Sequence, residues 1–184
     1  MNNIQIRTPQ EVAKRALILL GIFQAATGRE KSEVINILKN NNLWREVSEV
    51  EKNFLLKTSE ETKFEALQFG WRSEAVFILL WALKLVDVEE IPTDETNLDL
   101  IVDLLKHSNF YEKININKAQ LRESREIFDL LDMIHKIHWD LRDARLQNNN
   151  PSHNYHPSII YEWHYTLNWI VRPNEDWDYI TTDT

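Results

Sequence analysis

The side chains best suited to chemistry lie on a helix predicted over residues 119–147. Its apolar seam is interrupted at two positions, His138 and Arg145. His138 shares its side of the helix with Arg142, and Asp143 lies one step further round. An imidazole can exchange a proton near neutral pH, and a guanidinium can hold an anionic group. This helix therefore predicts one wall of a binding or catalytic site.

A second polar face lies on the last predicted helix, over residues 157–171. Tyr161, His164 and Asn168 follow one another at spacings of three and four residues, so they share one face. If this helix packs antiparallel to the long helix, the two polar faces meet. The sequence thus predicts a polar pocket between the two helices.

Three kinds of function fit such a pocket. The preferred interpretation is a binding module whose partner is an unidentified small molecule or protein. The first alternative is an enzyme in which His138 or His164 acts as general acid/base and Arg142 binds an anionic group. The second alternative is a structural or interaction protein, because buried polar groups must be hydrogen-bonded and a closed network can simply fix the packing. An open pocket would favour the first two classes.

The sequence predicts neither a metal nor a cofactor. His135 and His138 stand at i and i+3, and Asp132 or Asp143 could add a carboxylate, but no HExxH pattern completes a zinc site. The absence of Cys excludes disulfides, thiolate catalysis and Cys-ligated clusters. The sequence has only three scattered glycines, so it contains neither a phosphate loop nor a dinucleotide-binding fingerprint.

Composition and charge limit the classes of partner that the protein can bind. With 21 Lys and Arg against 29 Asp and Glu, the net charge is −8, so we expect no nucleic acid, whose phosphates need clustered cations. The longest apolar stretch lacks charge only over residues 75–83, which is too short to span a bilayer at about 20 residues. The N-terminus shows no signal-peptide pattern. We therefore expect a cytoplasmic protein without membrane contact.

The elements that must position these residues are all helical. The stretch 71–86 is apolar on every side of a helix, so it should be buried, with Trp81 in the core. Thr8 and Ser48 each begin a capping box. Gly70 should cause a helix break or kink just before the central helix. Trp177 and Ile180 should dock the tail. Helices are predicted from Thr8 to near Gly28 and over 31–41, 48–55, 60–69, 71–86, 98–107, 119–147 and 157–171.

These elements predict an all-α fold: a single domain over residues 1–184, built as an orthogonal bundle of about seven to eight helices around the buried central helix. Three Gly and five Pro are too few for a many-turned β-protein. No internal repeat or long linker divides the chain.

Five stretches together resemble a bacterial family of all-helical proteins, domain-of-unknown-function family 4272. They are RTPQEVAKRA, WRSEAVFILLWAL, HWDLRDARL, YEWHYTLNW and WDYITTDT. The resemblance implies no particular activity, cofactor or catalytic set, but it adds Arg72 and Glu74 to the candidate pocket. It also covers Arg142, Asp143, His164 and Asn168. One departure is Gly70, where the family more often has Ser or Ala, so we expect the helix there to be looser.

Overall fold

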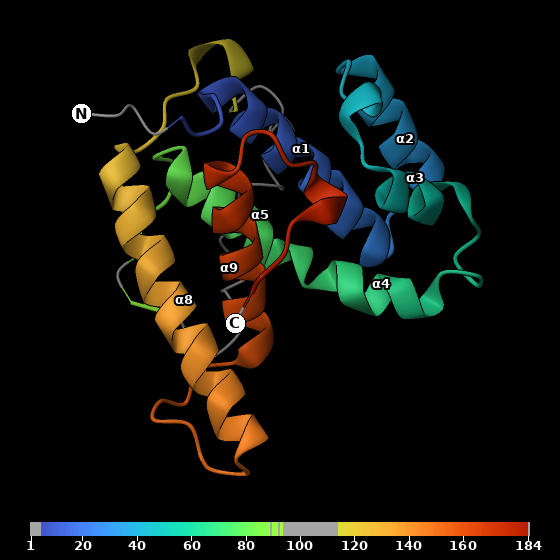
Figure 1. The fold of residues 1–184 in the computed structure, drawn as a ribbon. Coiled ribbons are helices and arrows are strands. Elements are labelled where there is room, and N and C mark those ends of the chain that lie inside the picture. The colour runs from blue at the N-terminus through green and yellow to red at the C-terminus, as the bar shows by residue number, and fades with distance from the viewer. Residues whose placement is uncertain (1–4, 89, 92, 94–113, 184) are drawn as a thin grey trace.

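A computed structural model describes residues 5–88, 90–91, 93 and 114–183, and every regular element in them is helical (Figure 1). The all-α prediction is therefore confirmed. The elements are α1 (Pro9–Ala26), α2 (Lys31–Asn40), η1 (Trp44–Glu46), α3 (Glu49–Leu56), α4 (Lys63–Gly70), α5 (Arg72–Ala82), η2 (Ile116–Lys118), α8 (Ser124–Leu146), α9 (Pro157–Val171) and η3 (Trp177–Tyr179), of which the η elements are single 3₁₀ turns.

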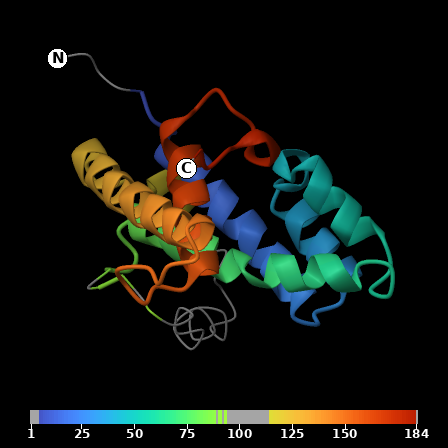
Figure 2. The same cartoon turned by 60° about the horizontal axis from the view of Figure 1, so that its bottom comes forward.

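Three helices form the core. The central helix predicted from its apolar residues is α5, which packs on α1 and on α9. Trp81, near its C-terminal end, is buried as predicted, with 7% of its surface exposed. α1 and α9 are buried as deeply as α5, because each carries apolar residues on most of its circumference. Figures 1 and 2 show α8 on one side of this core, beside α9, and α2 and α3 on the other, beyond α1.

Local signals set most helix ends. Thr8 and Ser48 form the two predicted capping boxes, with Glu11 and Glu51 at the third helical positions. The break predicted at Gly70 is also present, because α4 ends there and α5 begins at Arg72. α9 has the predicted bounds.

Three predictions need correction. α8 begins at Ser124 rather than at residue 119, because Arg122 is held away from a helical path: its N–H donates to Ala82 O and its Nε to Trp81 O. α4 begins at Lys63 rather than at residue 60. α5 ends at Ala82 rather than at residue 86. The described residues contain seven α-helices, against about seven to eight predicted for the whole chain, and the helix predicted over 98–107 lies outside them.

The C-terminal tail is docked on the body, as predicted. Trp177 and Ile180 have 4% and 6% of their surface exposed. Val50 N donates to Asp178 Oδ2 at 3.1 Å, which ties the tail to α3, and Asn168 Nδ2 donates to Thr181 O at 3.0 Å, which ties it back to α9. In Figure 1 the tail leaves the end of α9, passes in front of α1 and returns over α9.

Gly21 is tightly packed and Gly70 is not, so substitutions at these two positions should change the free energy of unfolding in opposite directions. A Cβ on Gly21 would lie 3.1 Å from Val34 Cγ1, so α2 rests directly on α1 at that point. Gly21→Val should lower the free energy of unfolding by about 2 kcal/mol through overpacking. Gly70 has open space around its Cα, so Gly70→Ala should raise it by about 0.5 kcal/mol. Urea denaturation of both variants measures the two changes, and equal effects would contradict this packing.

Candidate functional site

Three histidines meet where α8 packs on α9. The Nδ1 atoms of His138 and His164 are 2.9 Å apart, which is a hydrogen bond if one ring carries its proton there. The His135 ring stacks on His164 with centroids 5.2 Å apart, and Tyr161 presents its ring edge-on to His138 at 6.1 Å. The structure therefore brings together His138, Tyr161 and His164, as the sequence predicted.

Both members of this histidine pair favour the neutral form. Burial first, and then repulsion from His138 and His135, lower the pKa of His164 to about 4. Burial likewise lowers the pKa of His138, and Arg142 and His135 add to the effect. Two neutral imidazoles can share one proton, as donor and acceptor, whereas two imidazolium rings would repel each other.

Protonation of His164 should therefore destabilise the fold in acid. The folded pKa of about 4 lies below the unfolded value near 6.5, so this stability is present above pH 6.5 and is lost as the pH falls toward 4. Between pH 7 and pH 4.5 the loss should be about 2 kcal/mol. Urea melts should show a smaller loss in His164→Gln and an unchanged loss in His153→Gln, an exposed control. An equal loss in all three proteins would contradict it.

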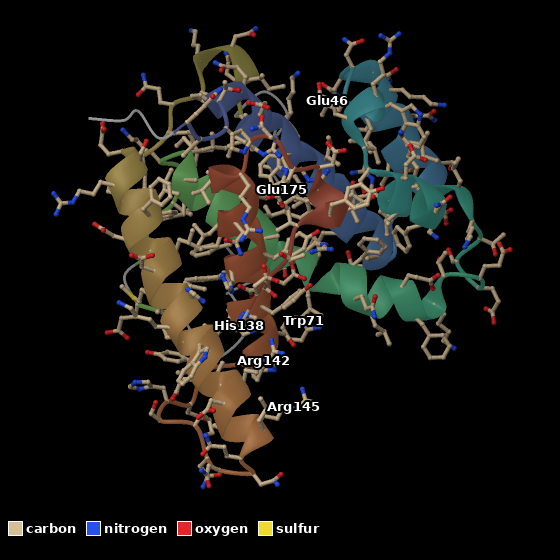
Figure 3. The ribbon with its side chains drawn as sticks, in the orientation of Figure 1. Glu46, Trp71, His138, Arg142, Arg145 and Glu175 are labelled. Atoms are coloured by element: carbon tan, nitrogen blue, oxygen red, sulfur yellow. The ribbon has the colours of Figure 1, made fainter. Side chains whose placement is uncertain are left out.

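The other predicted residues of α8 lie toward its end. His138, Arg142 and Arg145 project from the same side of α8 (Figure 3). Arg142 is exposed, and its charge helps to lower the pKa of His138. Asp143 accepts hydrogen bonds from Gln147, the residue that follows α8. Arg145 is solvent-exposed rather than on a buried seam, because the last turns of α8 run past the N-terminal end of α9 (Figure 1).

Arg72 and Glu74 belong to a closed network between α5 and α9. Arg72 Nη1 donates to Glu162 Oε2 at 2.8 Å, and Trp163 Nε1 donates to Glu74 Oε2 at 3.0 Å. Glu74, Glu162 and Trp163 are all buried. Burial raises the pKa of Glu162, and the Arg72 guanidinium partly offsets that rise. Arg72 and Glu162 therefore form an ion pair inside the protein, although Arg72 Nε has no acceptor within the described residues.

A different group of residues surrounds an open cleft. The cleft has a volume of about 450 Å³ and lies between α1, the η1–α3 segment and the tail. Figure 3 shows Glu46, which lines it, on the η1 side and Glu175 beside the tail. None of the residues predicted to form the pocket lines this cleft. The lining residues are Arg7, Glu11, Arg15, Ile18, Arg45, Glu46, Val47, Ser48, Glu49, Lys52, Trp169, Asp176, Trp177, Asp178 and Tyr179.

Two tryptophans of the lining each carry an arginine on one face. The Arg7 guanidinium lies 4.1 Å from the centre of the Trp169 ring, and that of Arg15 lies 4.2 Å from the centre of the Trp177 ring. The two tryptophans meet edge to face with centroids 5.5 Å apart. Such stacks fix arginine side chains while leaving them charged. The inner wall of the cleft is therefore rigid, aromatic and cationic.

The two inner arginines have different partners. Arg7 donates to backbone carbonyls at Trp169, Arg172 and Glu175, which fastens the tail to the start of α1. Arg15 forms a buried ion pair with Glu51, whose side chain also caps α3 by accepting from Ser48 N. Arg15 therefore joins α1 to α3.

Two buried donors beside the cleft lack an acceptor within the described residues. They are Arg15 Nε and Trp177 Nε1. Both side chains line the cleft and are 4% exposed. The Arg15 guanidinium at least rests on the Trp177 ring, but the indole N–H has no such compensation. An unsatisfied buried donor costs about 1–3 kcal/mol, so each of these two groups lowers the stability of the fold around the cleft.

The cleft was not predicted, although one signal pointed toward it. Arg15 interrupts the apolar run of α1, two helical turns before Ile22, and a buried arginine requires an acidic partner. The partner is Glu51. Its place in the capping box of α3 already accounts for a glutamate at that position, so the sequence gives no separate sign that Glu51 also pairs with Arg15. Among the described residues, no group of three or more His, Asp or Glu side chains is placed to hold a metal ion.

None of the described helices combines the length and the apolarity needed to cross a membrane. No curated protein and no solved structure matches the chain. Residues 1–180, nearly the whole chain, match the family described as Domain of unknown function (DUF4272). The chain belongs to this family.

Proposed function

We propose that the protein is a binding module for a small molecule, and that its site is the cleft between α1, the η1–α3 segment and the tail. The observation that carries the proposal is the cleft itself. Its volume of about 450 Å³ lies in the range of small-molecule sites, and its polar groups converge on an aromatic inner wall.

In this proposal the buried network predicted to form the pocket has a structural role. Arg72 and Glu74 already have partners in Glu162 and Trp163, and Asn168 holds the tail through Thr181 O. Groups that are already paired gain little from a ligand, because binding only exchanges one partner for another. They instead fix α9 against α5 and the tail against α9, which shapes the wall of the cleft.

Indole N–H resonances offer a direct test, because Trp177 lines the cleft. We expect a screen of small polar fragments against the full chain, labelled with ¹⁵N-tryptophan, to yield ligands that shift the Trp177 resonance. Trp177→Phe identifies that peak. Trp139, which is 56% exposed on α8, serves as the internal control and should not move. Ligands that shift Trp139 or no indole resonance at all would contradict the proposal.

A second candidate site is the α8–α9 seam, as the sequence predicted. It is favoured by the pair of neutral imidazoles beside Arg142, which could bind an anionic group or transfer a proton. Inorganic phosphate is a suitable probe. If this seam binds anions, phosphate should shift the ring resonances of His138, and Arg142→Gln should abolish the shift. Unchanged His138 resonances at millimolar phosphate would leave the seam a structural contact.

A further inference from the structure

We infer that the outer face of α4 is the contact surface of a homodimer, in which two copies of this chain pack α4 against α4 in antiparallel directions around a two-fold axis. The face consists of Phe64 and Leu67, and Trp71 continues it just beyond the end of the helix. None of these three residues lines the cleft between α1, the η1–α3 segment and the tail. The dimer contact is therefore a second functional surface, separate from the cleft.

The outer face of α4 is apolar. Phe64 and Leu67 have 83% and 72% of their surface exposed, and Phe64 is the most exposed large apolar side chain among the described residues. The two residues are three apart, so they are neighbours on one face of the helix. The other face is buried through Phe69, whose ring lies 4.5 Å from that of Phe54. A surface helix normally turns polar residues outward, so α4 has one apolar face more than the described fold covers.

Opposite charges flank this apolar face. At its N-terminal end, the stretch 58–65 contains three glutamates and one lysine, and Glu60 is exposed. At its C-terminal end, Trp71 stacks on His156, at the start of α9, with ring centroids 4.9 Å apart. The last turns of α8 run past this end of α9 and carry the exposed Arg145, on the same side of the molecule as Trp71 (Figure 3). The surface is therefore acidic at one end, apolar in the middle and basic at the other end.

Such a surface is complementary to itself under a two-fold rotation. In an antiparallel pair centred between residues 65 and 66, Phe64 of one copy meets Leu67 of the other, and the rotation makes this contact twice. Lys63 then lies opposite the neutral Gln68, so like charges do not meet at the centre. The acidic end of each copy approaches the basic end of the other. A second copy therefore supplies both the apolar partner and the opposite charge.

The size and charge of the surface favour a second copy over a membrane. A buried aromatic side chain covers about 150–250 Å², whereas a stable interface needs about 800 Å² from each partner. The apolar centre is therefore only part of the contact, and the charged ends complete it as a polar rim. A face that binds anionic lipid carries cations around its apolar residues, but the start of α4 is rich in glutamate. For a contact of this size we expect a dissociation constant of about 1–100 µM.

Sedimentation velocity of the full chain tests the inference. Over a concentration range of about 5–500 µM the parent protein should show a reversible monomer–dimer equilibrium. Phe64→Ser should raise the dissociation constant about tenfold or more, because the side chain occupies the centre of the contact twice. Tyr179→Ser is the matched control, since this tail side chain is 76% exposed but lies outside the proposed contact, and it should leave the equilibrium unchanged. Circular dichroism should show the same helix content in all three proteins.

An exchange of charges tests the two-fold arrangement. Glu60→Arg and Arg145→Glu should each weaken the dimer about tenfold, and the double variant should recover most of the loss, because residues 60 and 145 meet across the axis. The inference is overturned if the parent protein stays monomeric at about 500 µM, which would assign the face of α4 to a different partner. It is equally overturned if Phe64→Ser dimerises like the parent protein, or if the double charge variant is weaker than either single variant.

Discussion

Replacing Arg15 by methionine should lower the free energy of unfolding by about 3–5 kcal/mol. Arg15 and Glu51 are 4% and 1% exposed, so the substitution leaves a buried carboxylate without its cation. It also removes the stack on Trp177, which holds the tail. Urea denaturation at pH 7 measures the change. A loss below 1 kcal/mol would show that Glu51 finds another partner or reaches water.

A double substitution separates the charge from the packing. Arg15→Met with Glu51→Gln should recover part of the loss, because an amide at position 51 can still accept from Ser48 N without carrying a buried charge. Arg125→Met is the matched control. Its ion pair with Asp129 is 3.7 Å long and 91% exposed on the arginine side, so it should cost less than about 0.5 kcal/mol.

Deleting the tail after Asn174 should cost about 3 kcal/mol or more. The deletion removes buried Trp177 and Ile180, takes away the acceptor of the Tyr165 hydroxyl, and uncovers Arg15 and Arg72. Truncation of a buried tryptophan alone is worth about 3–5 kcal/mol, part of which the chain recovers as freedom of the released tail. Thermal and urea melts of the truncated chain measure the loss.

A point substitution distinguishes the docked residues from the rest of the tail. Trp177→Ala should reproduce most of the loss, whereas Tyr179→Ala, at a side chain that is 76% exposed, should cost less than about 0.5 kcal/mol. If the truncated chain and the parent protein melt together, the tail is not part of the folded unit.

Much of the fold follows from short-range signals. The capping boxes at Thr8 and Ser48 and the proline at position 157 set helix starts through contacts within four residues, so the sequence alone was sufficient. The apolar circumference of α5 likewise predicted its burial. The start of α8 could not be found this way, because it depends on Arg122 binding carbonyls at the end of α5, some 40 residues away.

The candidate sites differ in the same way: features set by spacing within one helix were predictable, and features set by contacts between distant segments were not. The meeting of His138 with His164 followed from helical spacing and one assumption about packing, and it was predicted. Arg145 was placed on the buried seam because spacing does not reveal where a neighbouring helix ends. The cleft was missed because its walls come from three distant segments, and its inner residues pair across the fold, as Arg15 does with Glu51.

One crystal structure would test the central claim most directly: the full chain, crystallised with the fragment that shifts the Trp177 resonance at the lowest concentration. The account predicts difference density in the cleft between α1, the η1–α3 segment and the tail, in contact with Trp169 and Trp177. Density on the α8–α9 seam beside Arg142, with the cleft empty, would contradict it and return the binding site to the two polar helix faces.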